Sequence, residues 1–90
     1  MLFHLFSYVI TIKNEKVMKA FGKHLKSIRI AKGLSQERLS ILANIPLSQM
    51  GRIERGEVNT TISSIYALAD ALNINAKELF EFNVNPKNRA

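Results

Sequence analysis

The sequence predicts an all-α domain of five short helices, preceded by an apolar N-terminal arm. From Val17 onward, apolar residues recur three and four positions apart, the spacing that places side chains on one face of a helix. Residues that end or begin helices interrupt this pattern at short intervals, and they are Gly33, Asn44, Pro46 and Gly56. The chain has 90 residues, which suffice for one domain and leave no room for a separate catalytic domain. We therefore expect a single helical domain over residues 17–82.

Residues 1–16 form the predicted arm, and its first twelve residues, MLFHLFSYVITI, are almost wholly apolar. This run is shorter than the ~20 residues that a membrane-spanning helix needs. It also lacks the basic leading region and the small-residue cleavage site of a signal peptide. Its spacing fits a strand and a helix equally. Because exposed apolar segments favour a partner, we expect the arm to pack on the domain or on a second subunit. The alternative is that Met18 is the natural start.

The first helix of the body begins at Val17. Phe21, Leu25 and Ile28 lie on one apolar stripe, while the lysines at positions 19, 23 and 26 lie largely off it. Gly33 ends this helix, because glycine enters the left-handed conformation at little cost.

The second and third helices are separated by a turn of only a few residues. Ser35 can cap the second helix, residues 36–43, in which Leu39 and Leu42 are expected to face inward. Asn44 ends that helix, since asparagine tolerates the left-handed turn geometry.

The third helix covers residues 47–54. Pro46 lies at or just before its start, where the missing amide hydrogen costs nothing. Gly56 closes the helix.

Two further helices complete the domain. Thr60 or Thr61 caps the fourth helix. Its broad apolar face consists of Ile62, Ile65, Leu68, Ala69 and Leu72. Asn75 caps a short fifth helix, which is expected to pack through Leu79, Phe80 and Phe82. Residues 83–90 form a polar tail that is expected to fray.

One face of the third helix is basic. Because residues three and four apart share a face, we define this basic strip as Leu47, Ser48, Gly51, Arg52 and Arg55, which carries two cations and no acid. The core side of the same helix consists of Met50 and Ile53. The whole chain has 13 Lys and Arg against 7 Asp and Glu, and its net charge of +6 favours an anionic partner such as nucleic acid. The alternative is a solvated basic face, but the short turn before the helix favours insertion into a DNA groove.

The composition argues against an enzyme. Without cysteine, the chain has no disulfide, thiolate zinc site or thiol nucleophile, which is compatible with a cytoplasmic location. Its two histidines, His4 and His24, lie in different segments and suggest neither a metal cluster nor a catalytic triad. We expect His24 to be an ordinary helix-surface residue. No glycine-rich phosphate loop follows a strand. The sequence predicts no catalysis, no metal and no cofactor.

Motifs spread over residues 20–80 resemble those of the phage lambda repressor and Cro family of helix-turn-helix proteins, also called the xenobiotic response element (XRE) family. They are Arg29, Gly33-Leu34-Ser35-Gln36-Glu37, Leu39, Ile45, Ile53-Glu54-Arg55-Gly56 and Ala69-x-Ala71-Leu72. Each short motif is weak alone, whereas their combination is specific. The resemblance implies a lambda-repressor-like fold, in which residues 36–43 are the first helix of the motif and residues 47–54 are the recognition helix in the major groove of DNA.

The resemblance also implies DNA contacts residue by residue. Gln36 matches a glutamine that touches phosphate at a helix N-terminus, with a local cap interaction as the alternative. Leu47, Ser48 and Arg52 match positions that meet base edges. Arg52 can pair with both acceptors of guanine. Leu47 can offer only apolar contact, or can instead pack partly buried, and Ser48 can donate to a base or a phosphate. Arg55 matches a position near the DNA backbone, where it would orient the domain without reading sequence.

Arg29 and Glu54 match a pair of residues that often forms an ion pair in this family, linking the first helix to the end of the third, and the alternative is direct contact with DNA. Three residues depart from the family pattern. Asn44 replaces the common turn glycine. Ser40 stands where alanine is usual, so its hydroxyl needs a partner. Gly51 weakens the recognition helix by about 1 kcal/mol relative to alanine, and either permits close approach to a phosphate or is merely tolerated.

The sequence therefore predicts a regulator of transcription that binds specific double-stranded DNA as a homodimer, reading two half-sites about 34 Å apart. Small stand-alone regulators of the family include restriction-modification controllers, phage repressors and antitoxins, and the sequence does not choose among them. The alternative is a protein-interaction module, antitoxin-like or scaffold-like, in which the helical domain and the apolar arm dock a protein partner. We predict no membrane association.

Overall fold

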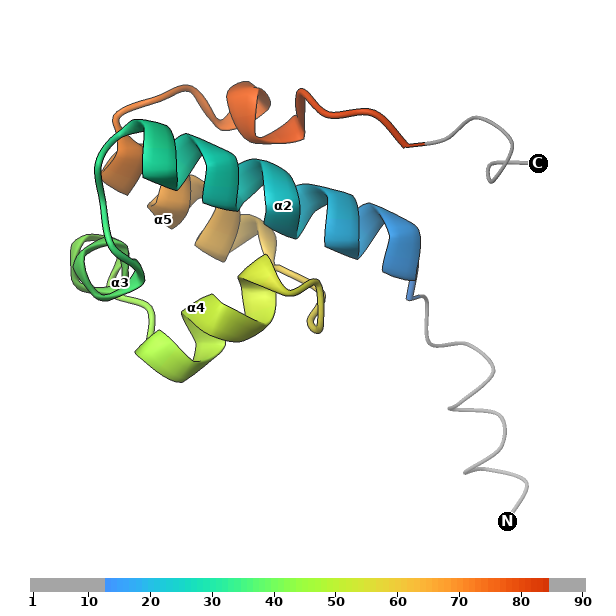
Figure 1. Cartoon of the computed structure of the whole chain (residues 1–90), viewed down its shortest axis with the longest axis horizontal. Helices are drawn as coiled ribbons and strands as arrows, with labels where there is room; N and C mark the ends of the chain where they lie inside the picture. The colour runs from blue at the N-terminus through green and yellow to red at the C-terminus, as the bar shows by residue number, and fades with distance from the viewer. Residues whose placement is uncertain (1–12, 85–90) are drawn as a thin grey trace, which may run out of the picture.

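The computed structural model describes residues 13–84, and Figure 1 shows their arrangement. This range contains α2 (Glu15–Ala31), α3 (Gln36–Ala43), α4 (Leu47–Glu54), α5 (Ile62–Leu72) and the 3-10 helix η1 (Ala76–Phe80). The all-α class is confirmed, but the fifth predicted helix is a single short 3-10 segment. The apolar run of the predicted arm and the end of the tail lie outside the described residues. Across residues 13–84, no helix is long and apolar enough to cross a membrane.

Side-chain caps set where the helices begin. The Oδ1 atom of Asn14 accepts a hydrogen bond from the Val17 amide at 3.1 Å, so α2 starts at Glu15 and not at the predicted Val17. Ser35 caps α3 as predicted, since its Oγ accepts from the Arg38 amide at 3.0 Å. Of the two threonines proposed for α5, Thr61 is the cap.

The turn between α3 and α4 depends on Asn44, which adopts the left-handed conformation at φ 56°. The following amide, that of Ile45, donates to the Ser40 carbonyl at 3.0 Å and closes the end of α3. Ile45 is itself buried, so the turn is anchored to the core. Asparagine is thus accommodated here in the left-handed conformation that glycine also adopts readily.

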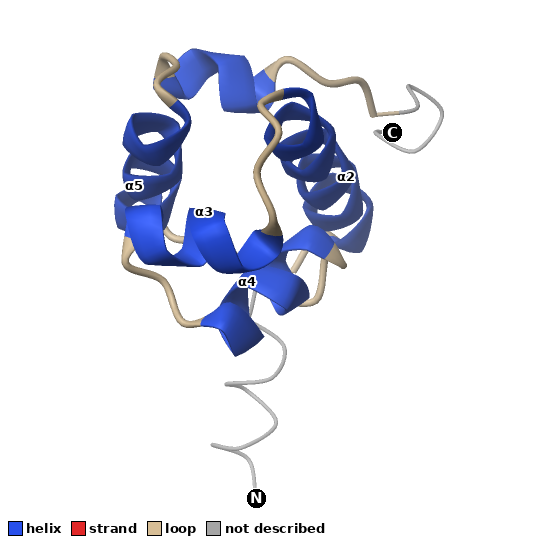
Figure 2. Ribbon diagram, turned by 60° about the vertical axis from the view of Figure 1, so that its left-hand side comes forward, coloured by secondary structure: helices blue, strands red, loops and turns tan. Residues whose placement is uncertain are grey.

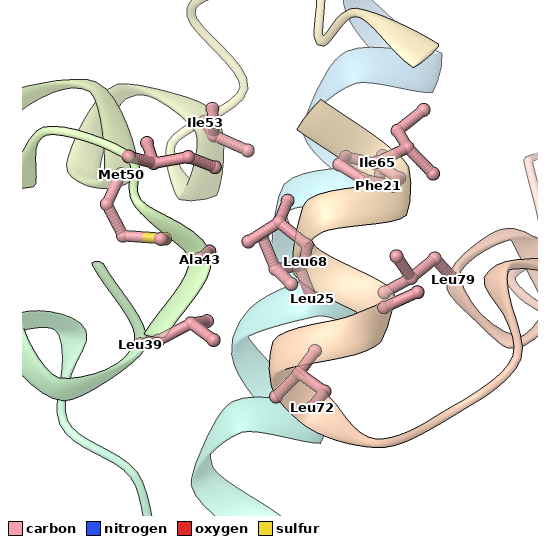
Figure 3. Packing of buried hydrophobic residues seen from close by; sticks show 12 residues of the cluster. Phe21, Leu25, Leu39, Ala43, Met50, Ile53, Ile65, Leu68, Leu72 and Leu79 are labelled. Atoms are coloured by element: carbon pink, nitrogen blue, oxygen red, sulfur yellow. The ribbon is translucent and has the colours of Figure 1, made fainter. Parts of the chain in front are cut away.

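The core lies where all five segments meet (Figure 3). Its fully buried side chains are Leu25 of α2, Leu39 of α3, Met50 and Ile53 of α4, Leu68 and Leu72 of α5, and Leu79 of η1. Helix α5 packs on α3, α2 packs on α4, and η1 covers α2 and α5 (Figures 1 and 2). Burial of these side chains from every segment holds α4 against the rest of the domain.

Three residues predicted to pack inward are instead exposed: Leu42 by 45%, Ile62 by 74% and Phe80 by 53%. In α3 the buried positions are Leu39, Ser40 and Ala43, which leave Leu42 at the margin of the buried face. Ile62 is the first residue of α5 and lies one turn before Ile65, where burial begins. Phe80 retains a ring contact with Phe21, with centroids 6.3 Å apart.

Helices α2 and α4 touch through their backbones at Gly22. A Cβ atom added there would lie 2.5 Å from the carbonyl oxygens of Ile53 and Glu54. Only glycine allows this approach, so the C-terminal end of α4 lies directly against α2.

Candidate nucleic-acid interface

Helix α4 presents one side to the core and the other to solvent. Met50 and Ile53 are almost fully buried, whereas Leu47, Ser48 and Arg52 are exposed. In Figure 1, α3 is seen nearly end-on and α4 nearly from the side, so the two helices cross steeply, and Figure 2 shows them together at one end of the molecule. Leu47 is 46% exposed, which leaves part of its side chain for an apolar contact.

Gly51 does not belong to the exposed strip, contrary to the prediction, because it is buried. A Cβ atom at Gly51 would lie 2.9 Å from Nη1 of Arg55, whose side chain lies back over the helix. Of the predicted strip, Leu47, Ser48, Arg52 and Arg55 are exposed on α4 and its C-cap, and Gln49 is exposed beside them.

A buried ion pair fixes the end of α4 to α2. Arg29 donates from Nε to Oε2 of Glu54 at 2.6 Å and from Nη2 to Oε1 at 3.0 Å, and the two side chains are 9% and 3% exposed. Nη1 of Arg29 also donates to the carbonyl of Leu34 at 2.8 Å. The hydrogen bonds to Glu54 raise the pKa of Arg29 above its ordinary value. This arrangement sets the position of α4 relative to α2 and to the start of the motif.

Gln36 takes part in the same network. Its Nε2 donates to Oε1 of Glu54 at 2.8 Å, so the side chain of the first residue of α3 holds the end of α4. This contact joins two helices and is not a local cap. The carboxamide carries a second N–H that this hydrogen bond does not use.

An acid that follows α4 lies beside both cations of the outward surface. Oε2 of Glu57 accepts from Nε of Arg55 at 2.8 Å, and Oε1 lies 3.4 Å from Nη2 of Arg55 and 3.9 Å from Nε of Arg52. The hydrogen bonds raise the pKa of Arg55 and lower the pKa of Glu57. The strip within the helix has no acid, but the turn after it supplies one. The sequence signal was present: an acid immediately after Gly56, the glycine that closes α4.

His24 joins two segments and is not the plain surface residue that the sequence suggested. Its Nε2 lies 2.7 Å from the Glu78 carbonyl oxygen, and its ring centroid lies 5.8 Å from that of Phe82. These contacts give it a role in attaching η1 to α2. Among residues 13–84, no group of three His, Cys, Asp or Glu side chains could hold a metal ion.

Known proteins share this fold and sequence pattern. The HTH_3 family model, described as helix-turn-helix, matches residues 25–79. Control protein C.BamHI of Bacillus amyloliquefaciens is 32% identical over 63 residues, which cover 69% of this chain and 78% of that protein. Control protein C.SmaI of Serratia marcescens is 32% identical over 63 residues, covering 70% and 75%. The crystal structure of the restriction-modification controller protein C.AhdI from Aeromonas hydrophila matches with a TM-score of 0.69 and 44% identity, over 70% of this chain and 96% of that one.

Proposed function

We propose that this chain, which belongs to the HTH_3 helix-turn-helix family, binds one specific duplex DNA sequence as a homodimer and acts as a controller of transcription. The chain is a DNA-binding regulator of the XRE, lambda repressor-like type and not an enzyme. Two of its relatives are named control proteins, and a similar solved structure is that of a restriction-modification controller. We extend that role to this chain.

The observation that carries the proposal is the outward side of α4. Arg52 and Arg55 lie on the exposed side of α4 and its C-cap, the other side of the helix is buried, and the Arg29–Glu54 pair holds its end in place. A helix fixed in this way can enter the major groove without losing further conformational freedom.

We assign the contacts as follows. Arg52 reads a guanine through its two acceptors, and Leu47 contacts a thymine methyl. Ser48 donates to a base or to a phosphate. Arg55 and the second N–H of Gln36 bind phosphates and fix the register of the domain on the duplex.

The homodimer follows from the small number of base contacts. One recognition helix of eight residues presents few side chains to the bases, and a good bidentate contact discriminates by only about 1–3 kcal/mol. Specific binding typically exceeds random binding by about 4–10 kcal/mol. Two recognition helices on two half-sites double the number of base contacts and bring the discrimination into this range.

The test is selection of bound sequences from a pool of random duplexes at 50 mM salt, followed by binding measurements with variants. A two-fold symmetric consensus is expected. Arg52→Ala should lose preference at one base position in each half-site. Arg55→Ala should weaken binding to all sequences and lower the salt slope by about 0.9 for each phosphate that the protein no longer neutralises.

Lys77→Ala is the matched control, because it removes one positive charge from the exposed surface of η1. It should alter neither the consensus nor the salt slope by a comparable amount. An absence of binding at 50 mM salt, or a pool that returns no preferred sequence, would refute the regulator. An asymmetric consensus would refute the homodimer, and an unchanged consensus with Arg52→Ala would refute the base contact.

A further inference from the structure

Glu57 is held beside the cations of α4 by the backbone that ends the helix. Gly56 turns the chain at φ 72°. Its amide donates to the Ile53 carbonyl at 3.0 Å, and the Glu57 amide donates to the Arg52 carbonyl at 2.9 Å. This pair of hydrogen bonds is the Schellman arrangement, which fixes the residue after the glycine relative to the last helical turn.

The turn itself has little freedom to move. A Cβ atom on Gly56 would lie 2.6 Å from the Cα of Lys19, so the turn lies directly on the backbone of α2. The position of the Glu57 carboxylate therefore depends on two helices and not only on its own side chain. That side chain is 48% exposed, beside Arg55 at 60% and Arg52 at 57%.

The Glu57 carboxylate is hydrogen-bonded to Arg55 but not to Arg52. It accepts a hydrogen bond from Arg55 at 2.8 Å, whereas Nε of Arg52 lies 3.9 Å away, which is beyond hydrogen-bond distance. Nε of Arg52 is thus not hydrogen-bonded to Glu57 and can serve another acceptor. A carboxylate and a phosphate bind the same donors of a guanidinium, so Glu57 occupies on Arg55 the place that a phosphate would take.

We propose that Glu57 competes with DNA phosphate for Arg55 and thereby limits the sequence-independent affinity of the protein for DNA. The inference rests on the proposed function, in which Arg55 contacts the DNA backbone. To bind a phosphate, Arg55 must give up its hydrogen bond to Glu57. The Glu57 carboxylate then remains close to the DNA, and the two negative charges repel each other. The effect is greatest on random DNA, where both arginines contact the backbone and sequence-independent charge supplies nearly all of the affinity. A regulator gains from this because competing random sites vastly outnumber its own.

The test is binding of a random-sequence duplex by the full chain over a range of salt concentrations from 50 mM. Glu57→Gln keeps the shape of the side chain and removes its charge. We expect it to bind random DNA about two- to fivefold more tightly, the range typical of one exposed ion pair, with no larger gain on the selected sequence. The salt slope should become steeper by up to about 0.9.

Two further variants separate competition from a general gain of positive charge. Glu81→Gln makes the same change of charge at the exposed C-cap of η1, a segment that lies on the other side of α2 from α4 in Figure 1, and should give a clearly smaller gain. In the Arg55→Ala background, Glu57→Gln should lose most of its effect.

The possible failures are distinguishable. If the wild-type protein binds duplex DNA but Glu57→Gln matches Glu81→Gln, or binds more weakly than wild type, the competition is refuted and the proposed function stands. A gain that persists in full without Arg55 also refutes it. If neither the wild type nor Glu57→Gln binds duplex DNA at 50 mM salt, the proposed function itself fails.

Discussion

Removal of the Glu54 carboxylate should destabilise the domain more than any change on the outward side of α4. Glu54 accepts three hydrogen bonds, two from Arg29 and one from Gln36. In Glu54→Ala, the Arg29 guanidinium stays in a site where the residue is only 8% exposed, with the Leu34 carbonyl as its other partner. Leaving such a charge buried and unpaired costs about 3–5 kcal/mol. A domain of this size is stable by roughly 5–15 kcal/mol, so the loss is a large fraction of the total.

Urea unfolding followed by circular dichroism measures this loss, with Glu57→Ala as the matched control because it removes an exposed carboxylate near the same helix end. The midpoint should fall strongly for Glu54→Ala and little for the control. A double variant, Arg29→Met with Glu54→Leu, removes both charges and fills the space, and should recover much of the stability. A Glu54→Ala midpoint close to that of wild type would refute the reasoning. So would a double variant no more stable than Glu54→Ala, because the buried charge would then not be the cause.

Three further predictions concern single positions. Among the described residues, the Ser40 hydroxyl is buried without a hydrogen-bond partner, so Ser40→Ala should raise the free energy of unfolding by about 1–3 kcal/mol in the same urea assay. Gly22→Ala should lower it by about 1–3 kcal/mol in spite of the better helix propensity of alanine, because the new methyl group meets two carbonyl oxygens of α4; unchanged stability would show that the helices can separate freely. The Glu57 carboxyl should titrate below its ordinary pKa by NMR and return toward it in Arg55→Ala, since hydrogen bonds from Arg55 lower that pKa. Because the folded-state pKa is the lower one, the stabilisation by this pair is present at neutral pH and is lost as the pH falls through the pKa of Glu57.

Local chemistry was enough to predict most helix boundaries. Ser35 caps α3, Asn44 turns the chain after it, and Pro46 precedes the first residue of α4. Each of these acts on the backbone within a few residues of itself, so no knowledge of the fold was needed. Helix α2 was the exception: its apolar pattern begins at Val17, but its cap is Asn14.

Features that depend on contacts between segments were not predictable from spacing. Leu42 has the right type and spacing for burial, but α3 turns Leu39, Ser40 and Ala43 toward the core. The backbone contact at Gly22 joins α2 to the end of α4, and a helical pattern gives no sign of it. The spacing of apolar residues shows which face of a helix is apolar. It does not show which residues of that face a neighbouring segment covers.

The two carboxylates at the end of α4 show how position decides what an ion pair does. Glu54 lies inside the α2–α4 junction, where water cannot replace its partners, so the pair with Arg29 sets the position of α4. Glu57 lies three residues later on the solvent side, where water reaches the Arg55 pair, so that pair can exchange in the proposed complex with DNA. If Glu57 competes with phosphate as proposed, a change at position 57 alters the affinity for DNA without loosening α4. Variation at position 57 should therefore change binding while leaving the unfolding midpoint nearly constant, whereas variation at position 54 should change both.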